Sequence, residues 1–126
     1  MKLITRDLFF CFTLLLADCS LETTEIERVS NSSKSIDAVV VLQETGATVA
    51  TPIAIYLRPV IAKSDSHPIF RADHVSGLKV TWTGDFKLII HAEEARVLLI
   101  KDRLDVDIAG KNKQPINIAL DARYLL

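Results

Sequence analysis

The chain has few of the residues that usually carry a recognisable chemistry or a covalent framework. Its 126 residues include two cysteines, three histidines, four glycines and four prolines. The glycines stand singly, which excludes a glycine-rich cradle for phosphate. The net charge is -1, so the chain lacks the basic excess of a nucleic-acid-binding protein, and we expect no nucleic acid as a partner.

Motifs of nucleophilic catalysis are also missing, since the chain has no Gly-x-Ser-x-Gly and no Ser-x-x-Lys. Glu93 and Glu94 are neighbours in sequence, so their side chains would diverge on a helix or a strand. Asp105 and Asp107 would share one face of a strand, where charge keeps the protein soluble and discourages pairing between strand edges. We therefore expect no catalytic residue and no cofactor.

A metal or acid-base site would have to be assembled from His67, Asp73, His74 and His91, with Asp65 as a further carboxylate. Histidine is a common metal ligand and a proton carrier near neutral pH. The spacing of these residues matches no metal-binding motif. We expect no metal, and we keep as an alternative a small envelope hydrolase that uses His74 or His91 with a nearby carboxylate.

The amino-terminal segment resembles an export signal. An apolar stretch over residues 8–17 follows Lys2 and Arg6. As a helix it would rise about 15 Å at ~1.5 Å per residue, too little to cross a hydrocarbon core of ~30 Å. Its length and its positive flank are typical of a secretory signal. We predict a signal peptide over residues 1–19, with cleavage at or next to Cys19.

Two processing outcomes stay open. Leu16-Ala17-Asp18-Cys19 resembles the lipobox of bacterial lipoproteins, in which the cysteine is diacylated and becomes the new amino terminus. Asp18 departs from the small residue of that pattern. On this interpretation Cys19 is the lipidation site and membrane anchor, and Ser20 resembles the sorting signal for the periplasmic side of the outer membrane. Ordinary cleavage after Cys19 would instead release a soluble periplasmic or secreted protein.

The remainder divides into a tether and one domain. Residues 20–35 are rich in serine, threonine and glutamate, a composition typical of a flexible tether, and a short helical turn over 21–29 stays open. Because Cys11 lies in the segment that would be removed, the mature chain has no pair for a disulfide. Its length allows one hydrophobic core, so we predict a single β-rich domain over residues 36–126.

Within that domain, short β-branched runs alternate with turn residues. Gly84-Asp85 separates two alternating runs and predicts a hairpin, and a turn-rich segment over 110–115 predicts a second one. Pro59 should bend its strand or place it at an edge, because proline lacks the ladder donor. Residues 93–103 fit a helix or a strand, and we favour the strand. The expected strands cover 36–43, 53–62, 69–72, 78–83, 86–91, 104–109 and 116–121.

This pattern predicts the fold class. Short strands at regular spacing, with at most one short helix, are typical of a mainly β protein built as a small antiparallel sandwich or partly open barrel. About seven strands are expected.

The order of motifs resembles a group of small uncharacterised bacterial exported proteins and lipoproteins. The resemblance rests on the strand start Ser35-Ile36-Asp37, the turn Gly46-Ala47-Thr48 and a later hairpin that contains Trp82. It covers about residues 33–92, and Thr45 stands where a cysteine often precedes the turn in that group. It implies a bacterial origin and an envelope location, and it implies no activity.

We therefore predict an exported, non-enzymatic binding domain that meets a protein partner in the envelope, with an immunity or inhibitor protein as one version. The candidate interaction residues are Trp82, Tyr56 and His74. Aromatic side chains at strand positions can serve as core or as interface anchors. A structural or assembly lipoprotein is the third hypothesis, and it would need an exposed strand edge open to pairing.

Overall fold

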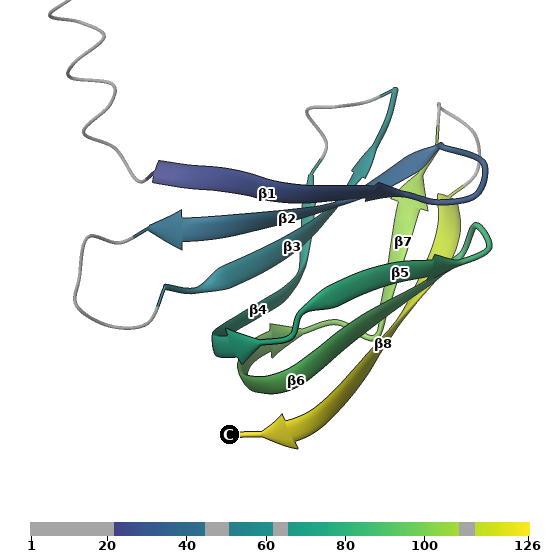
Figure 1. Cartoon of the computed structure of the whole chain (residues 1–126). Coiled ribbons are helices and arrows are strands. Elements are labelled where there is room, and N and C mark those ends of the chain that lie inside the picture. The colour runs from purple at the N-terminus through teal and green to yellow at the C-terminus, as the bar shows by residue number, and fades with distance from the viewer. Residues whose placement is uncertain (1–21, 45–50, 62–65, 109–112) are drawn as a thin grey trace, which may run out of the picture.

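The computed structural model describes residues 22–44, 51–61, 66–108 and 113–126. Of these residues, 79% lie in strands and none in a helix. The strands form one open sheet, which confirms the mainly β fold class of a partly open sandwich or barrel (Figure 1). The predicted signal peptide, Cys19, the Gly-Ala-Thr turn and Asp65 lie outside the described residues. The strands are β1 (Glu22–Ser30), β2 (Ile36–Glu44), β3 (Ile53–Pro59), β4 (His67–Ser76), β5 (Lys79–Thr83), β6 (Lys87–Ile100), β7 (Arg103–Asp107) and β8 (Lys113–Leu125).

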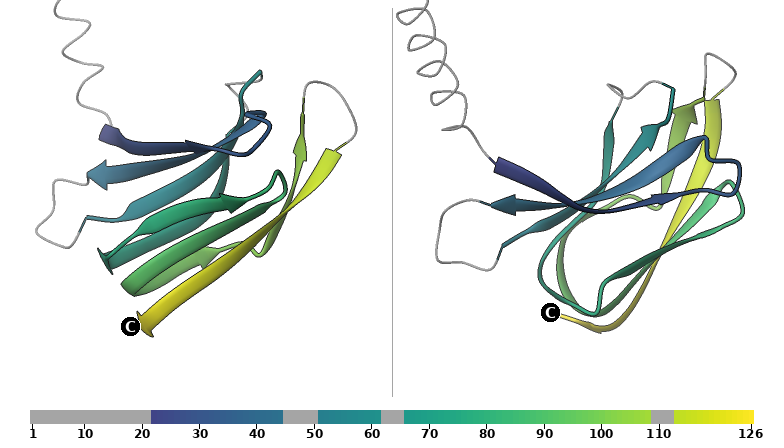
Figure 2. Two further views of the ribbon diagram at one scale, coloured as in Figure 1. Left: turned by 45° about the vertical axis from the view of Figure 1, so that its right-hand side comes forward. Right: turned by 45° about the horizontal axis from the view of Figure 1, so that its top comes forward.

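The sheet has the order β1-β2-β3-β4-β6-β8-β7, and β5 pairs with β6 outside this path. All pairs are antiparallel except β6 with β8, which run parallel. β6 pairs with three strands, because it is 14 residues long and curls as it crosses the molecule (Figure 2). Its first half pairs with β5 and β8, and its second half pairs with β4. The sheet therefore folds back on itself without closing.

The buried core is built from the inward-facing side chains of this curled sheet. In β6 the alternation is clear, since Leu88, Ile90 and Ala92 are buried while the residues between them are less buried. A second, smaller cluster lies on the outer side of β2 and β3, where Val39 and Ala54 are also buried. Both faces of β2 are therefore covered by apolar side chains.

The prediction of a flexible tether over residues 20–35 is wrong for residues 22–30, and the helical turn that stayed open over 21–29 is absent from residues 22–29. These residues form β1, which pairs along its length with β2. Residues 23–28 are all exposed, because β1 is an edge strand with little of the core against it. Such a strand needs no apolar face, so its composition is the same as that of a tether.

Both predicted hairpins are present, as the antiparallel pairs β5–β6 and β7–β8. The strand alternative for residues 93–103 is confirmed as far as Ile100, where β6 ends. β4 is longer than the expected strand over 69–72, since it begins at His67 and ends at Ser76. β3 ends at Pro59, and its pairing with β4 ends two residues earlier at Leu57, as expected where proline removes a ladder donor.

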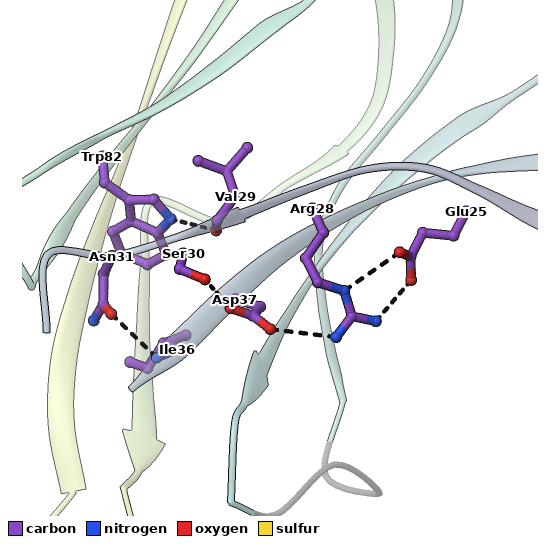
Figure 3. A network of polar contacts seen from close by, with 8 residues as sticks. All are labelled: Glu25, Arg28, Val29, Ser30, Asn31, Ile36, Asp37 and Trp82. Carbon is purple, nitrogen blue, oxygen red and sulfur yellow. Dashed lines mark hydrogen bonds and ion pairs between the residues drawn. The ribbon is translucent and has the colours of Figure 1, made fainter. Parts of the chain in front are cut away.

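The turn between β1 and β2 is attached to the turn between β5 and β6 by one buried side chain. Asn31 is 2% exposed, and its Oδ1 accepts a hydrogen bond from the backbone N–H of Ile36 (Figure 3). The same oxygen accepts a second one from the backbone N–H of Ser35. Its Nδ2 donates to the Asp85 carbonyl over 3.2 Å. Ser33 N–H also donates to the Asp85 carboxylate. Segments 52 to 54 residues apart in sequence are thereby held together.

Candidate functional site

The three candidate interaction residues lie apart. Trp82 packs against the core, and its indole N–H donates to the Val29 carbonyl over 2.8 Å, which links β5 to β1 (Figure 3). Tyr56 belongs to the outer cluster over β2 and β3, where Gln43 Nε2 donates to its hydroxyl over 3.4 Å. His74 is exposed on β4. Trp82 therefore has a structural role in this fold, as a cross-link between two strands.

His74 belongs to an ionic cluster around Asp73. The Asp73 carboxylate is mostly buried and accepts two hydrogen bonds from the Arg96 guanidinium, one of 2.7 Å from Nε and one from Nη2. His74 Nδ1 lies 3.0 Å from the same carboxylate. Arg96 first and His74 second hold the pKa of Asp73 well below its usual range. His74 has a φ of 53°, in the left-handed region, where the pairing of β4 with β6 is interrupted by a bulge. The ion pair from Arg96 on β6 to Asp73 on β4 connects the two strands at this bulge.

A second ionic cluster fastens the edge strand. Arg28 on β1 donates to Glu25 over 2.7 Å and to Asp37 on β2 over 3.3 Å (Figure 3). Ser30 Oγ donates to the other oxygen of Asp37 over 2.6 Å. The Arg28 hydrogen bond lowers the pKa of Glu25. These contacts satisfy the buried carboxylate of Asp37 and attach β1 to β2, so their role is structural.

A polar ladder crosses the outer face of β5, β6 and β8. Thr81 Oγ1 lies 3.3 Å from His91 Nε2, and His91 Nδ1 lies 3.3 Å from Asp121 Oδ2. The parallel register sets His91 beside Asp121, and the antiparallel register sets Thr81 diagonally across from His91. A hydroxyl, an imidazole and a carboxylate in this order allow the carboxylate to orient the ring and the ring to accept the hydroxyl proton.

A shallow open groove lies along this ladder. Its volume is about 310 Å³, and it is lined by Gly77, His91, Ala92, Glu93, Asp121 and Arg123. Gly77 has a φ of 64°, and a Cβ built there would lie 2.9 Å from the Cβ of Glu93. Glycine is needed at this position both for its backbone conformation and for the close approach of β6.

The histidines are not gathered into one site. His91 is the one histidine that lines the groove, whereas His67 begins β4 and His74 lies at the β4 bulge. Asp73 binds Arg96 and does not line the groove either. Over the described ranges of the chain, no group of three or more His, Cys, Asp or Glu residues is arranged to hold a metal ion. Of the two histidines kept for a hydrolase, His91 is the one that lies in a groove with carboxylates.

Most of the exposed large apolar side chains lie in two short segments, one at the end of β6 and one at the end of the chain, in and after β8. Of the nine large hydrophobic side chains exposed in the described part of the chain, six lie in two short segments, and their exposed fractions run from 37 to 63%. The register places Tyr124 beside Glu94 and Leu125 beside Ala95, a few residues before the exposed stretch of β6. We call these six residues the β6–β8 apolar surface: Leu98, Leu99, Ile100, Tyr124, Leu125 and Leu126.

The sequence does not single out this surface. The run Val97-Leu98-Leu99-Ile100 is typical of a buried strand, yet the last three of these side chains are exposed because β6 has curled past the end of β8. An interruption of the strict alternation in β8 after Asp121 was the available signal, since Tyr124 and Leu125 are adjacent and both apolar.

No protein-family model, no curated protein and no solved structure matches this chain. Among the residues that the structure describes, no helix has the length and apolar character needed to traverse a bilayer.

Proposed function

We propose that the protein is an exported bacterial envelope protein, anchored through lipidated Cys19, whose folded domain is a non-enzymatic interaction module. The support for export is the leading apolar segment with its positive flank and the lipobox-like Leu16-Ala17-Asp18-Cys19. The described core cluster is built from residues between Ile36 and Ile118. A lipid on Cys19 would anchor the chain in the membrane three residues before β1 begins at Glu22.

The observation that carries the interaction role is the β6–β8 apolar surface. Large apolar side chains scattered singly over a surface are ordinary, whereas a concentration of them marks a site of association. Tyr124 adds an aromatic ring, a residue type enriched at the energetic centres of interfaces. The Arg123 guanidinium lies 5.6 Å from the centre of that ring, so a cation flanks the apolar residues. A protein partner in the envelope, of the class that an immunity or inhibitor protein binds, fits such a surface.

Export and anchoring are tested by the mass of the mature protein. The full-length chain is expressed in a Gram-negative bacterium, and the membrane fraction is analysed by intact mass spectrometry. We expect a chain that begins at Cys19 and carries acyl groups, and we expect Cys19→Ser to remove them. A full-length, unmodified chain in the cytosol would refute export.

The interaction role is tested by capture of partners from envelope extracts with wild-type protein and with Leu98→Ser and Leu125→Ser. Ile26→Ser and Phe86→Ser are matched controls, because these residues are large, apolar and exposed elsewhere, on β1 and in the turn between β5 and β6. We expect a stoichiometric partner that the first pair of variants loses and the control pair keeps. Equal capture by all four variants would refute the assignment of the surface.

A second candidate function, a small envelope hydrolase, is favoured by the Thr81–His91–Asp121 ladder alone. In this mechanism Asp121 accepts from the His91 Nδ1–H, and His91 Nε2 takes the hydroxyl proton of Thr81 as Thr81 Oγ1 attacks the carbonyl carbon of an ester. The bond from this carbon to the alcohol oxygen breaks, the alcohol leaves with the proton from His91, and water then hydrolyses the acyl-threonine. Hydrolysis of p-nitrophenyl acetate by wild-type protein, lost in Thr81→Val and His91→Ala and kept in His74→Ala, is the expected result for this candidate. Rates equal to buffer for the wild type would remove it.

A further inference from the structure

One edge of β8 is only partly used by the fold. On one side β8 pairs with β6 from Asn117 to Leu125. On the other side β7 covers only Lys113 to Asn117, followed by one hydrogen bond from the Ile118 N–H to the Asp102 carbonyl. Within the described ranges, no strand pairs with residues 119–125 on that side. This free edge of β8 offers main-chain donors and acceptors to a further strand (Figure 2).

The side chains along the free edge divide cleanly between the two faces of the sheet. Asp121 and Arg123 line the groove on the outer face. Leu120 and Ala122 point the other way and pack against the core cluster. Asp121 and Arg123 are both exposed, and Arg123 forms no ion pair with any described residue. An added strand must therefore supply charges on one face and apolar groups on the other.

We propose that a second copy of this chain supplies that strand, and that two copies pair antiparallel through residues 119–125 about a two-fold axis at Ala122. In this register Asp121 of each copy lies opposite Arg123 of its partner, which gives two opposite-charge pairs on the outer face. Leu120 lies opposite Tyr124 on the inner face, and Ala119 lies opposite Leu125. Directly opposed residues of antiparallel strands share a face, so charge meets charge and apolar meets apolar throughout.

The same seven residues disfavour the neighbouring registers. A shift by two residues in one direction sets Asp121 opposite Asp121, and in the other direction sets Arg123 opposite Arg123, which opposes like charges at the axis. A shift by one residue sets the charged face of one copy against the apolar face of the other. A two-fold interface uses one surface twice, and of these registers only the one centred on Ala122 sets each charged residue opposite a residue of opposite charge.

Pairing through the free edge deepens the proposed function and rests on it, because the β6–β8 apolar surface lies at the end of the same strand. Tyr124 and Leu125 belong to both, so the second copy would cover part of that surface. An edge of seven residues is small for an interface in dilute solution. Confinement of both copies to one membrane by their lipid anchors would raise their effective concentration and populate the pair.

Charge reversal in the full-length protein tests the register. Sedimentation velocity in mild detergent is expected to show a concentration-dependent dimer for the wild type. Asp121→Arg alone and Arg123→Asp alone each oppose like charges at two symmetric positions, so each should weaken dimerisation by about tenfold or more. An equimolar mixture of the two variants restores both opposite-charge pairs and should recover the dimer. Asp105→Arg, an exposed charge reversal on β7, is the control and should leave the dimer unchanged.

A monomeric wild type at every concentration, or a mixture of variants that fails to recover the dimer, would overturn the proposal. If the monomer still captured a different envelope protein through Leu98 and Leu125, self-pairing would be refuted and the proposed function would stand. If instead the dimer formed with the expected charge dependence in a protein found unprocessed in the cytosol, the register would stand and export would fail.

Discussion

Replacement of Asn31 by alanine should destabilise the whole domain, although Asn31 lies in a turn. Its side chain makes four hydrogen bonds, accepting from the N–H groups of Ser35 and Ile36 and donating to Ser35 Oγ and the Asp85 carbonyl. Alanine removes all four. Because Ile36 is buried, its N–H could not bond to water instead and would be left without an acceptor. The substitution also cuts the attachment between the β1–β2 and β5–β6 turns.

The size of the loss follows from these contacts. A neutral hydrogen bond contributes roughly 1 kcal/mol net, and a buried donor left unsatisfied costs about 1–3 kcal/mol. We therefore expect Asn31→Ala to lower the free energy of unfolding by about 2–4 kcal/mol, a large part of the ~5–15 kcal/mol typical of a domain.

Urea unfolding followed by the fluorescence of the single tryptophan is a suitable assay, since Trp82 is bonded to Val29 next to this turn. The midpoint should fall in Asn31→Ala while the slope of the transition stays constant. Asn117→Ala is the matched control, because Asn117 is exposed on β8. A loss for Asn31→Ala that is no greater than for Asn117→Ala, both within about 0.5 kcal/mol of wild type, would refute the reasoning.

Three further substitutions test other contacts. Trp82→Phe keeps an aromatic ring but loses the donor to the Val29 carbonyl, and should cost roughly 1 kcal/mol in urea unfolding followed by far-ultraviolet circular dichroism, since this variant has no tryptophan; an unchanged midpoint would mean that this hydrogen bond adds nothing. Gly77→Ala introduces a Cβ against Glu93 at a positive φ and should cost about 1–2 kcal/mol, seen as a lower melting temperature; a neutral or stabilising effect would contradict the close approach. Asp73→Asn removes a carboxylate whose pKa is lowered in the folded state, so wild-type stability exceeds that of the variant above pH 3.8, and the difference shrinks as the pH falls below that value. A difference that stayed constant down to pH 2 would argue against this ion pair.

The sequence is sufficient to predict elements that depend only on residues close together in the chain. The β5–β6 hairpin follows from alternation around Gly84-Asp85, and the fold class follows from many short alternating runs. β1 was missed because an edge strand exposed along most of its length needs no apolar face, so its residues are those of a linker. The parallel pairing of β6 with β8 was missed as well, since it depends on the curl of β6 and on no motif within either strand.

The candidate site was less predictable than the fold for the same reason. His91 and Asp121 are 30 residues apart in sequence and meet through the parallel register. The exposure of Leu98 likewise depends on where β8 ends relative to β6. Trp82 was correctly placed on a hairpin strand, yet its hydrogen bond to β1 could not be expected while residues 22–30 were interpreted as a tether.

Site-specific photocrosslinking in cells tests most directly whether the β6–β8 apolar surface is where this protein binds a partner. A photoreactive residue is placed at Leu125 in the full-length chain, and at Asp107 on the exposed face of β7 as a control. The account predicts a light-dependent adduct in the envelope fraction from position 125 and none from position 107, and a mass twice that of the chain would identify the partner as a second copy. No adduct from position 125, or equal adducts from both positions, would contradict it.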